Sequence, residues 1–220
     1  MYDEISLVQQ LMSTAPRGRP LDGALLVALG INVDIASSLA EKGWLTELQS
    51  GVYLMRGDSP SLDGTICYLA GLVDELHVAE RTALSWRGVR HNIYFREPVY
   101  LWGSSYLEIP AWVVNFFPIT YTNAVIFDEQ LECSHYLRSA PGRHPEILVS
   151  STELAAFELI STSQNPDLHE GVRNLLILLR NVRVAILQTL ADHCIDRNTV
   201  LLLKELAHAE GVPWADELQT

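Results

Sequence analysis

Glycine and proline divide the first sixty residues into short segments, and the positions of these residues constrain the fold more than any other feature. The spacing of apolar residues predicts a first helix that ends at the proline- and glycine-rich residues 15–20. Two more short helices are predicted over residues 21–29 and 32–42, because Gly30 ends one and Gly43 closes the other. The chain therefore begins with three short helices in succession.

A strand, a tight turn and a second strand follow these helices. Residues 44–48 and 52–55 are rich in apolar side chains, and the turn residues 49–51 join them as a β-hairpin. Three helices followed by a hairpin is the order of a winged helix-turn-helix, which we assign to residues 1–57. Any small helical bundle that carries a hairpin has the same pattern, so this alternative stays open.

The rest of the chain, residues 62–220, predicts a second domain in which strands are followed by helices. Residues 56–61 resemble a linker, and the sequence then predicts a helix over residues 62–72. Mixed strands followed by helices indicate an α+β fold that ends in helices. The predicted strands are 99–102, 111–117, 121–127 and 147–149, and the predicted helices are 153–160, 168–190 (with a break near Arg180) and 199–210.

Composition and charge limit the partners of the chain. Its 220 residues carry 15 Lys and Arg against 27 Asp and Glu, a net charge of −12. A surface this acidic does not bind nucleic acid or an anionic membrane over its whole area, although a local site on it can bind DNA. Three widely spaced cysteines, an acidic N-terminus and the lack of an 18-residue apolar run predict a cytoplasmic protein without disulfides or membrane contact.

The third predicted helix and its neighbours supply the candidate DNA contacts. In a helix-turn-helix this helix enters the major groove, where serine and asparagine side chains read base edges, while arginines and the hairpin tip contact the backbone or the minor groove. Against this, residues 1–60 hold four basic and seven acidic residues, so a solvated helix face, solvated loop arginines and a purely structural turn remain alternatives. The candidate contacts are Arg17, Arg19, Asn32, Ser37, Ser38, Lys42, Gln49 and Ser50.

Three arginines near the C-terminus form the clearest local excess of positive charge. Arg173, Arg180 and Arg183 lie in a stretch without acidic residues, and on one continuous helix they would fall within about 80° of one another. Such a stripe could contact RNA or phosphate. The alternative is that the three arginines pair with carboxylates of the same chain.

Signatures of catalysis and of metal binding are missing from the sequence. It has no GxSxG, P-loop or GxGxxG motif and no CxxC pair, so we predict no catalytic residues, no metal and no cofactor. Residues 103–105 are similar to the glycine–serine turn of nucleotidyltransferases. The D-x-D or D-x-E carboxylates that this chemistry needs do not follow on the next predicted strand.

Five segments, in this order, resemble the AbiEi family, the antitoxins of type IV toxin–antitoxin systems and related transcriptional regulators. GWLTELQSGVY at residues 43–53 is similar to the family's G-x-L-x-R-L-x-x-G-V-Y, and HVAERTALSWRG at 77–88 to its H-V-G-G-R-T-A-L-x-x-H-G. VYLWG at 99–103, VSSTELA at 149–155 and LRNVRV at 179–184 resemble a V-x-L-x-G strand, a V-S-x-P-E-R-A block and a basic helix start. The resemblance covers most of the chain.

The resemblance implies a function in two parts. The winged helix would bind inverted repeats in operator DNA and repress its own operon, and residues 62–220 would counter a nucleotidyltransferase toxin without a stable complex. Two alternatives belong to other classes. The winged helix could serve as a protein-interaction or regulatory module that no longer binds DNA, as its acidity allows, and an unrecognised enzyme could be built around the second domain.

Overall fold

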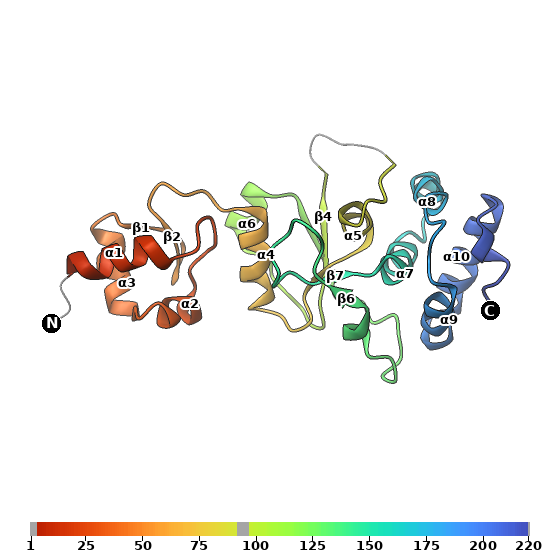
Figure 1. Cartoon of the computed structure of the whole chain (residues 1–220), viewed down its shortest axis with the longest axis horizontal. Coiled ribbons are helices and arrows are strands. Elements are labelled where there is room, and N and C mark those ends of the chain that lie inside the picture. The colour runs from red at the N-terminus through yellow and green to blue at the C-terminus, as the bar shows by residue number, and fades with distance from the viewer. Residues whose placement is uncertain (1–3, 92–96, 220) are drawn as a thin grey trace. The chain divides into compact units, whose positions relative to one another are not determined.

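The protein has an α+β fold with two compact units, described here from a computed structural model (Figure 1). The structure describes residues 4–91 and 97–219, and of residues 4 and 5 the backbone alone. The first unit takes the described residues up to Leu72 together with Ile109–Phe117, and the second unit takes the other described residues.

The first unit begins with the predicted order of three helices and a hairpin. Side-chain caps fix where two of the helices start: Asp22 Oδ1 accepts from the Leu25 N–H at 2.8 Å, and Asn32 Oδ1 accepts from the Ile35 N–H at 2.9 Å. Asn32 thus caps the third helix. The elements are α1 (Glu4–Thr14), α2 (Gly23–Ala28), α3 (Val33–Glu41), β1 (Leu45–Gln49) and β2 (Val52–Met55).

One apolar core joins these elements. Strands β1 and β2 pair antiparallel, with a bulge between Glu47 and Gln49, and Leu21 forms an isolated bridge to Tyr53 of β2. The chain before α2 is thereby held against the hairpin. The most buried members of this core are Leu11, Leu21, Leu26, Ile31, Ala36, Leu39 and Leu45.

Two further helices, α4 (Leu62–Ala70) and α6 (Ala111–Phe116), also belong to the first unit. Helix α4 begins at the predicted place. The strand predicted over residues 111–117 is wrong, because this segment is helical: Trp112 and Val113 are buried and the rest of α6 is exposed. The Trp112 ring packs against Tyr68 of α4 with centroids 5.6 Å apart, and this packing overrides the strand preference of valine and aromatic residues.

The second unit contains a five-stranded mixed sheet in the order β5-β4-β3-β7-β6. Strand β3 pairs antiparallel with β4 and parallel with β7, while β4 and β5 are parallel and β6 and β7 antiparallel. Two predicted strands are displaced, since β5 and β7 occupy only part of 121–127 and 147–149. The strands are β3 (His77–Val78), β4 (Val99–Trp102), β5 (Ile119–Thr122), β6 (Leu137–Arg138) and β7 (Val149–Ser150).

Helix α7 is the central helix of the second unit. Its residues 153–160 are all buried, and it packs against α5, α8, α9, α10 and β7 (Figure 1). The predicted helix 168–190 is broken between α8 and α9, near Arg180. The helices are α5 (Glu80–Trp86), α7 (Thr152–Thr162), α8 (His169–Leu176), α9 (Val184–His193) and α10 (Arg197–Ala209), with 3₁₀ turns at Cys133–Tyr136, Pro166–Leu168 and Pro213–Ala215.

Within the described residues, no helix combines the length and the apolar character needed to cross a bilayer.

A close backbone approach in the first unit generates a stability prediction. A Cβ at Gly64 of α4 would lie 2.5 Å from the Gly18 carbonyl oxygen and 2.7 Å from Arg19 Cα. We therefore expect Gly64→Ala to lower the free energy of unfolding by about 1–3 kcal/mol, measured by urea denaturation. The matched control is Gly23→Ala at the start of α2, where a Cβ meets no atom within 4 Å. Equal losses in both variants would contradict this explanation.

Candidate functional site

Helix α3 and its two cap residues hold part of the candidate DNA contacts. Ser37 and Lys42 are exposed and Ser38 is half-buried. Asn32 is exposed as well, but its side-chain oxygen is engaged as the helix cap. Ser37 and Glu41 of α3 line a shallow groove, about 340 Å³ in volume, together with Leu45, Glu47 and Tyr53 of the hairpin.

The other candidates in the first unit lie on the hairpin and on the loop after α1. Arg17 forms an ion pair with Asp58, whose second oxygen accepts from the Gly18 N–H at 3.1 Å. Gln49 donates from Nε2 to the Tyr68 hydroxyl at 3.1 Å, so its side chain is held by α4. All four positions face solvent to some degree: Arg17, Gln49 and Ser50 are exposed, and Arg19 is half-buried.

The three arginines of the predicted stripe do not share a helix. Arg173 lies on α8 and pairs with Glu210 at 3.8 Å, whereas Arg180 and Arg183 lie in the segment between α8 and α9. The Arg183 guanidinium donates to both oxygens of buried Glu153, at 3.0 and 2.7 Å. Burial would raise the pKa of Glu153, but the hydrogen bonds from Arg183 lower it below its ordinary value.

Intramolecular pairing, the alternative left open by the sequence, therefore accounts for two of the three arginines. Arg180 is exposed, and in the described part of the chain its guanidinium has one hydrogen bond, to the Ile177 carbonyl at 3.4 Å. Of the predicted stripe, Arg180 retains the side chain most available to a partner.

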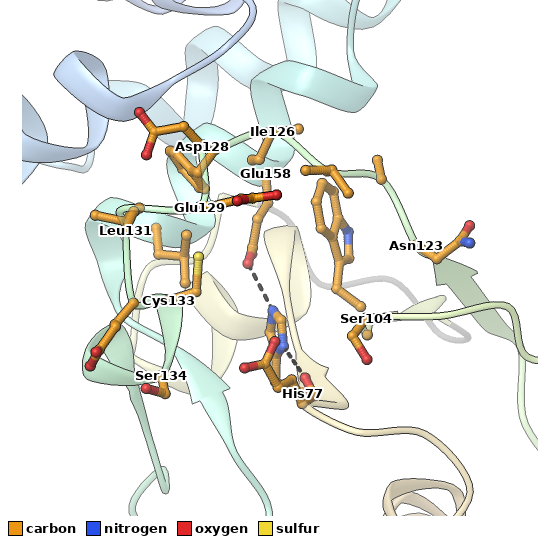
Figure 2. A pocket seen from close by; sticks show the side chains of 18 residues that line it. His77, Ser104, Asn123, Ile126, Asp128, Glu129, Leu131, Cys133, Ser134 and Glu158 are labelled. Atoms are coloured by element: carbon orange, nitrogen blue, oxygen red, sulfur yellow. Dashed lines mark hydrogen bonds and ion pairs between the residues drawn. The ribbon is translucent and has the colours of Figure 1, made fainter.

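A cavity of about 560 Å³ opens in the second unit beside the ends of β3 and β4 (Figure 2). Its walls combine apolar and acidic side chains from the sheet, from α7 and from the loop that follows β5. The larger apolar residues are Trp102, Val125, Ile126, Phe127, Leu131 and Leu154. The acidic residues are Glu75, Asp128, Glu129, Glu132 and Glu158.

A buried histidine–glutamate pair forms one end of this cavity. Figure 2 shows Glu158 reaching from α7 to His77, whose Nε2 lies 3.0 Å from Glu158 Oε1. His77 Nδ1 donates to the Glu75 carbonyl at 2.7 Å. Burial alone would lower the pKa of His77, but the hydrogen bond to Glu158 and its charge outweigh burial and raise that pKa. An imidazolium–carboxylate pair fits these contacts.

A second buried carboxylate, Glu80, is connected to the same network. Glu158 Oε2 accepts from the Glu80 N–H at 3.0 Å, while Glu80 itself accepts from Trp102 Nε1 at 2.9 Å and from the Thr162 hydroxyl at 3.1 Å. Burial raises the pKa of Glu80 to about 7, although the hydrogen bonds from Trp102 and Thr162 act in the opposite direction. Glu80 therefore titrates near neutrality, next to a residue that lines the cavity.

Backbone strain is concentrated at the two ends of β3. Glu75 has φ of 58° and Glu80 has φ of 48°, and among the described residues other than glycine these two have a positive φ. Glutamate is a poor residue for the left-handed region, and each such position costs about 1–3 kcal/mol. The surrounding contacts hold both glutamates in place beside the cavity, as is common at binding and active sites.

The cysteine that lines this cavity is not an activated nucleophile. Burial, together with the charges of Glu75 and Glu158, raises the pKa of Cys133 to about 11. His135, two residues further on, pairs with Glu132 at 2.9 Å. Cys133 and His135 therefore do not form a thiolate–imidazole couple.

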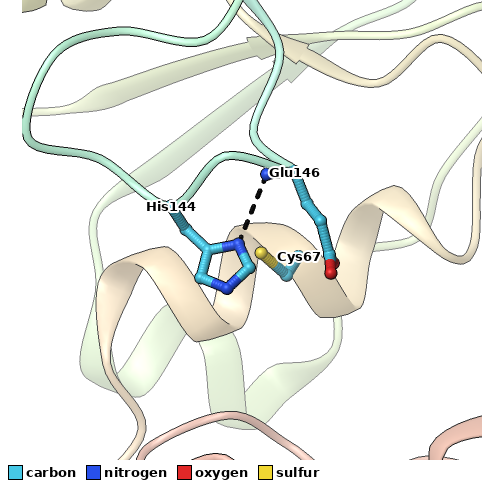
Figure 3. Close-up of side chains that lie close together, drawn as sticks. All are labelled: Cys67, His144 and Glu146. Carbon is cyan, nitrogen blue, oxygen red and sulfur yellow. Dashed lines mark hydrogen bonds between the residues drawn. The ribbon is translucent and has the colours of Figure 1, made fainter.

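Another histidine lies in the loop before β7 (Figure 3). His144 Nδ1 accepts from the Glu146 N–H at 3.4 Å, and both residues belong to the second unit. Cys67, drawn with them, lies on α4 of the first unit, so we assign no site to these three residues.

Sequence reasoning did not find the network around His77. The motif at residues 77–88 includes His77 and Glu80, but their partner Glu158 is 81 residues from His77 and sits in a helix predicted from its apolar pattern. The one available signal was a glutamate at the centre of an apolar helix.

The structure defines the class of protein: it is an α+β chain with a first unit that begins with a helix–hairpin arrangement and a second unit built on a mixed sheet. Residues 4–95 match the family model for the AbiEi antitoxin N-terminal domain of transcriptional regulators, and residues 96–220 match the model for the AbiEi antitoxin transcriptional regulator of type IV toxin–antitoxin systems. The chain belongs to the AbiEi family of antitoxin transcriptional regulators, which confirms the resemblance.

A solved structure agrees with this fold. The crystal structure of the RV2827C protein from Mycobacterium tuberculosis is similar with a TM-score of 0.61 and 14% sequence identity, over 97% of this chain and 80% of that one. At this identity the likeness concerns the fold alone. No curated protein matches the chain at a significant level.

The raised pKa of Glu80 predicts how stability depends on pH. The folded state binds the proton of Glu80 up to about pH 7, while the unfolded state loses it near 4.5. The free energy of unfolding therefore falls as the pH rises through this window, by up to about 3 kcal/mol. Urea denaturation at several pH values should show this fall relative to Glu80→Gln, which cannot titrate. Parallel pH profiles of the two proteins would refute the assignment.

Proposed function

We propose that the protein is a cytoplasmic antitoxin-like autorepressor that binds inverted repeats in operator DNA through α1–α3 and the β1–β2 hairpin, as a winged helix-turn-helix. The observation that carries the proposal is the place of α3 between α2 and the hairpin, in a chain that belongs to a family of transcriptional regulators. Helix α3 follows α2 after a short turn, precedes the hairpin, exposes Ser37 and ends at its exposed cap residue Lys42. Val33 at its start is 71% exposed, and such an apolar side chain suits a thymine methyl group.

One observation favours a second candidate, a protein-interaction module that does not bind DNA. Glu41 and Glu47 line the groove between α3 and the hairpin, where they would repel phosphate. Residues 1–60 also carry three more acidic than basic residues. The two candidates differ in one measurable property, the affinity for the protein's own upstream DNA.

A gel-shift titration at two salt concentrations tests DNA binding, with the upstream fragment compared with a scrambled one. We expect salt-sensitive binding that prefers the upstream fragment. Lys42→Gln should weaken binding to both fragments alike and lower the slope of log affinity against log salt by about one, since it removes one phosphate contact. Ser37→Ala and Ser38→Ala should instead reduce the preference for the upstream fragment.

Two variants act as controls for this titration. Lys204→Gln removes the same charge from α10 in the second unit and should leave binding unchanged. Glu47→Gln removes a carboxylate from the groove and should strengthen binding. If neither fragment binds even at low salt, the DNA-binding proposal fails and the interaction module is favoured.

We further propose that the second unit counters a nucleotidyltransferase toxin encoded alongside it, without a stable complex. Family membership supports this part, and the basic residues Arg173, Arg180 and Arg183 are its proposed contact for RNA or phosphate. Because Arg180 is exposed and lacks a carboxylate partner among the described residues, we propose it as the main contact of the three.

Growth rescue during coexpression with the neighbouring nucleotidyltransferase tests this contact. Wild type should restore growth, and Arg180→Gln should restore it less, because a charge at the proposed contact is lost. Arg197→Gln is the matched control, since Arg197 is also exposed and also donates to one main-chain carbonyl, that of Ala191 at 3.4 Å. Equal rescue by both variants would exclude Arg180, and co-elution of toxin and antitoxin in size-exclusion chromatography would exclude antagonism without a complex.

A further inference from the structure

The cavity of the second unit has the size and the walls of a small-molecule site. Its volume of about 560 Å³ lies within the range of about 300–1,000 Å³ that is usual for ligand pockets. Such pockets combine apolar walls with a few placed polar groups, as Trp102, Phe127 and Leu131 do here with His77 and Glu158. Neither DNA binding nor the arginine contact of the proposed function uses this cavity.

The charge of the walls selects the class of ligand. Five carboxylates line the cavity, and none of its described lining residues is lysine or arginine. Glu158 is balanced by His77, and Asp128 and Glu132 lie 3.0 and 2.9 Å from His193 and His135. In the described part of the chain, Glu75 and Glu129 have no such ion pair. A ligand that fills the cavity therefore meets an excess of negative charge.

Hydrogen bonds hold the side chains at one end of the cavity in a fixed arrangement, so this end is preorganised. Glu158 accepts from His77, from the Ser150 hydroxyl at 2.8 Å and from the Glu80 N–H, so its carboxylate is fixed by three donors. Trp102 is fixed in turn by its bond to Glu80. The strained glutamates at both ends of β3 show that surrounding contacts, and not local backbone preference, set this geometry.

We propose that this cavity binds a small organic cation, namely a primary amine that carries an aromatic or aliphatic body. The ammonium group would lie near the carboxylates of Glu75 and Glu129, and the body would pack on the apolar wall that includes Trp102. Aromatic faces attract cations as well, so the indole suits both parts of such a ligand.

Isothermal titration calorimetry of the full chain with tryptamine tests the proposal, and its matched neutral analogue is tryptophol, which has a hydroxyl in place of the ammonium group. For a ligand of this size we expect one site with a Kd of about 0.1–1 mM. Tryptophol should bind about tenfold or more weakly, because it lacks the charged hydrogen bonds. Equal affinities of the two compounds, or no binding of tryptamine at about 10 mM, would overturn the proposal.

Variants of two exposed carboxylates that line the cavity, Glu75 and Glu129, locate the binding site. The double variant Glu75→Gln and Glu129→Gln should weaken tryptamine binding by about threefold to tenfold, since it removes both carboxylates without an ion-pair partner. Glu170→Gln is the control, an exposed glutamate of α8 outside the cavity. Equal weakening in both proteins would show a general charge effect and refute the site.

A steric variant gives an independent answer. Ala124 is exposed and lines the cavity, so Ala124→Trp should fill it and abolish tryptamine binding. Ala185→Trp adds the same bulk on the exposed surface of α9 and should bind as wild type does. Binding that survives in a folded Ala124→Trp protein would place the amine elsewhere, and if this variant does not fold, the double glutamine variant still decides the question.

Discussion

The carboxylate of Glu158 joins helix α7 to two strands of the sheet and to the start of α5. It extends from a helix that is buried on all sides and accepts hydrogen bonds from the side chain of His77 on β3, from that of Ser150 on β7 and from the main chain where α5 begins. A buried charge is tolerated only when such donors surround it, so the sheet, α5 and α7 have to meet in one arrangement. The cavity lies beside this junction, and the same hydrogen bonds hold the end of the cavity that His77 and Glu158 form.

The three helices and the hairpin of the first unit could be predicted from the sequence because their determinants are local. Gly30 and Gly43 end the second and third helices, Asn32 caps α3, and Gly51 lies in the turn of the hairpin. Each of these signals acts over a few residues, and none requires knowledge of a distant partner. The family resemblance, carried by motifs along the chain, extended this prediction to the second unit, but it located no side chain in space.

The features that the sequence could not predict depend on distant partners. The helix at 111–116 was mistaken for a strand because its burial is decided by α4, which precedes it by some forty residues. For Arg183 the sequence leaves open a basic helix face or pairing with a carboxylate, and only the fold identifies the partner, buried Glu153, which lies 30 residues earlier. The histidine–glutamate pair of the cavity is likewise invisible to local pattern, since only the sheet topology brings β3 and α7 together.

The left-handed backbone at Glu80 also bears on how this family can diverge. Glycine would relax the backbone there, but it would leave the Trp102 indole N–H and the Thr162 hydroxyl without their acceptor. Glutamine would keep an acceptor without relaxing the backbone. A relative that has glycine at position 80 should therefore also have replaced the tryptophan at position 102. Aligned homologues should therefore show covariation between these two positions, which lie on α5 and β4, two elements that pack together.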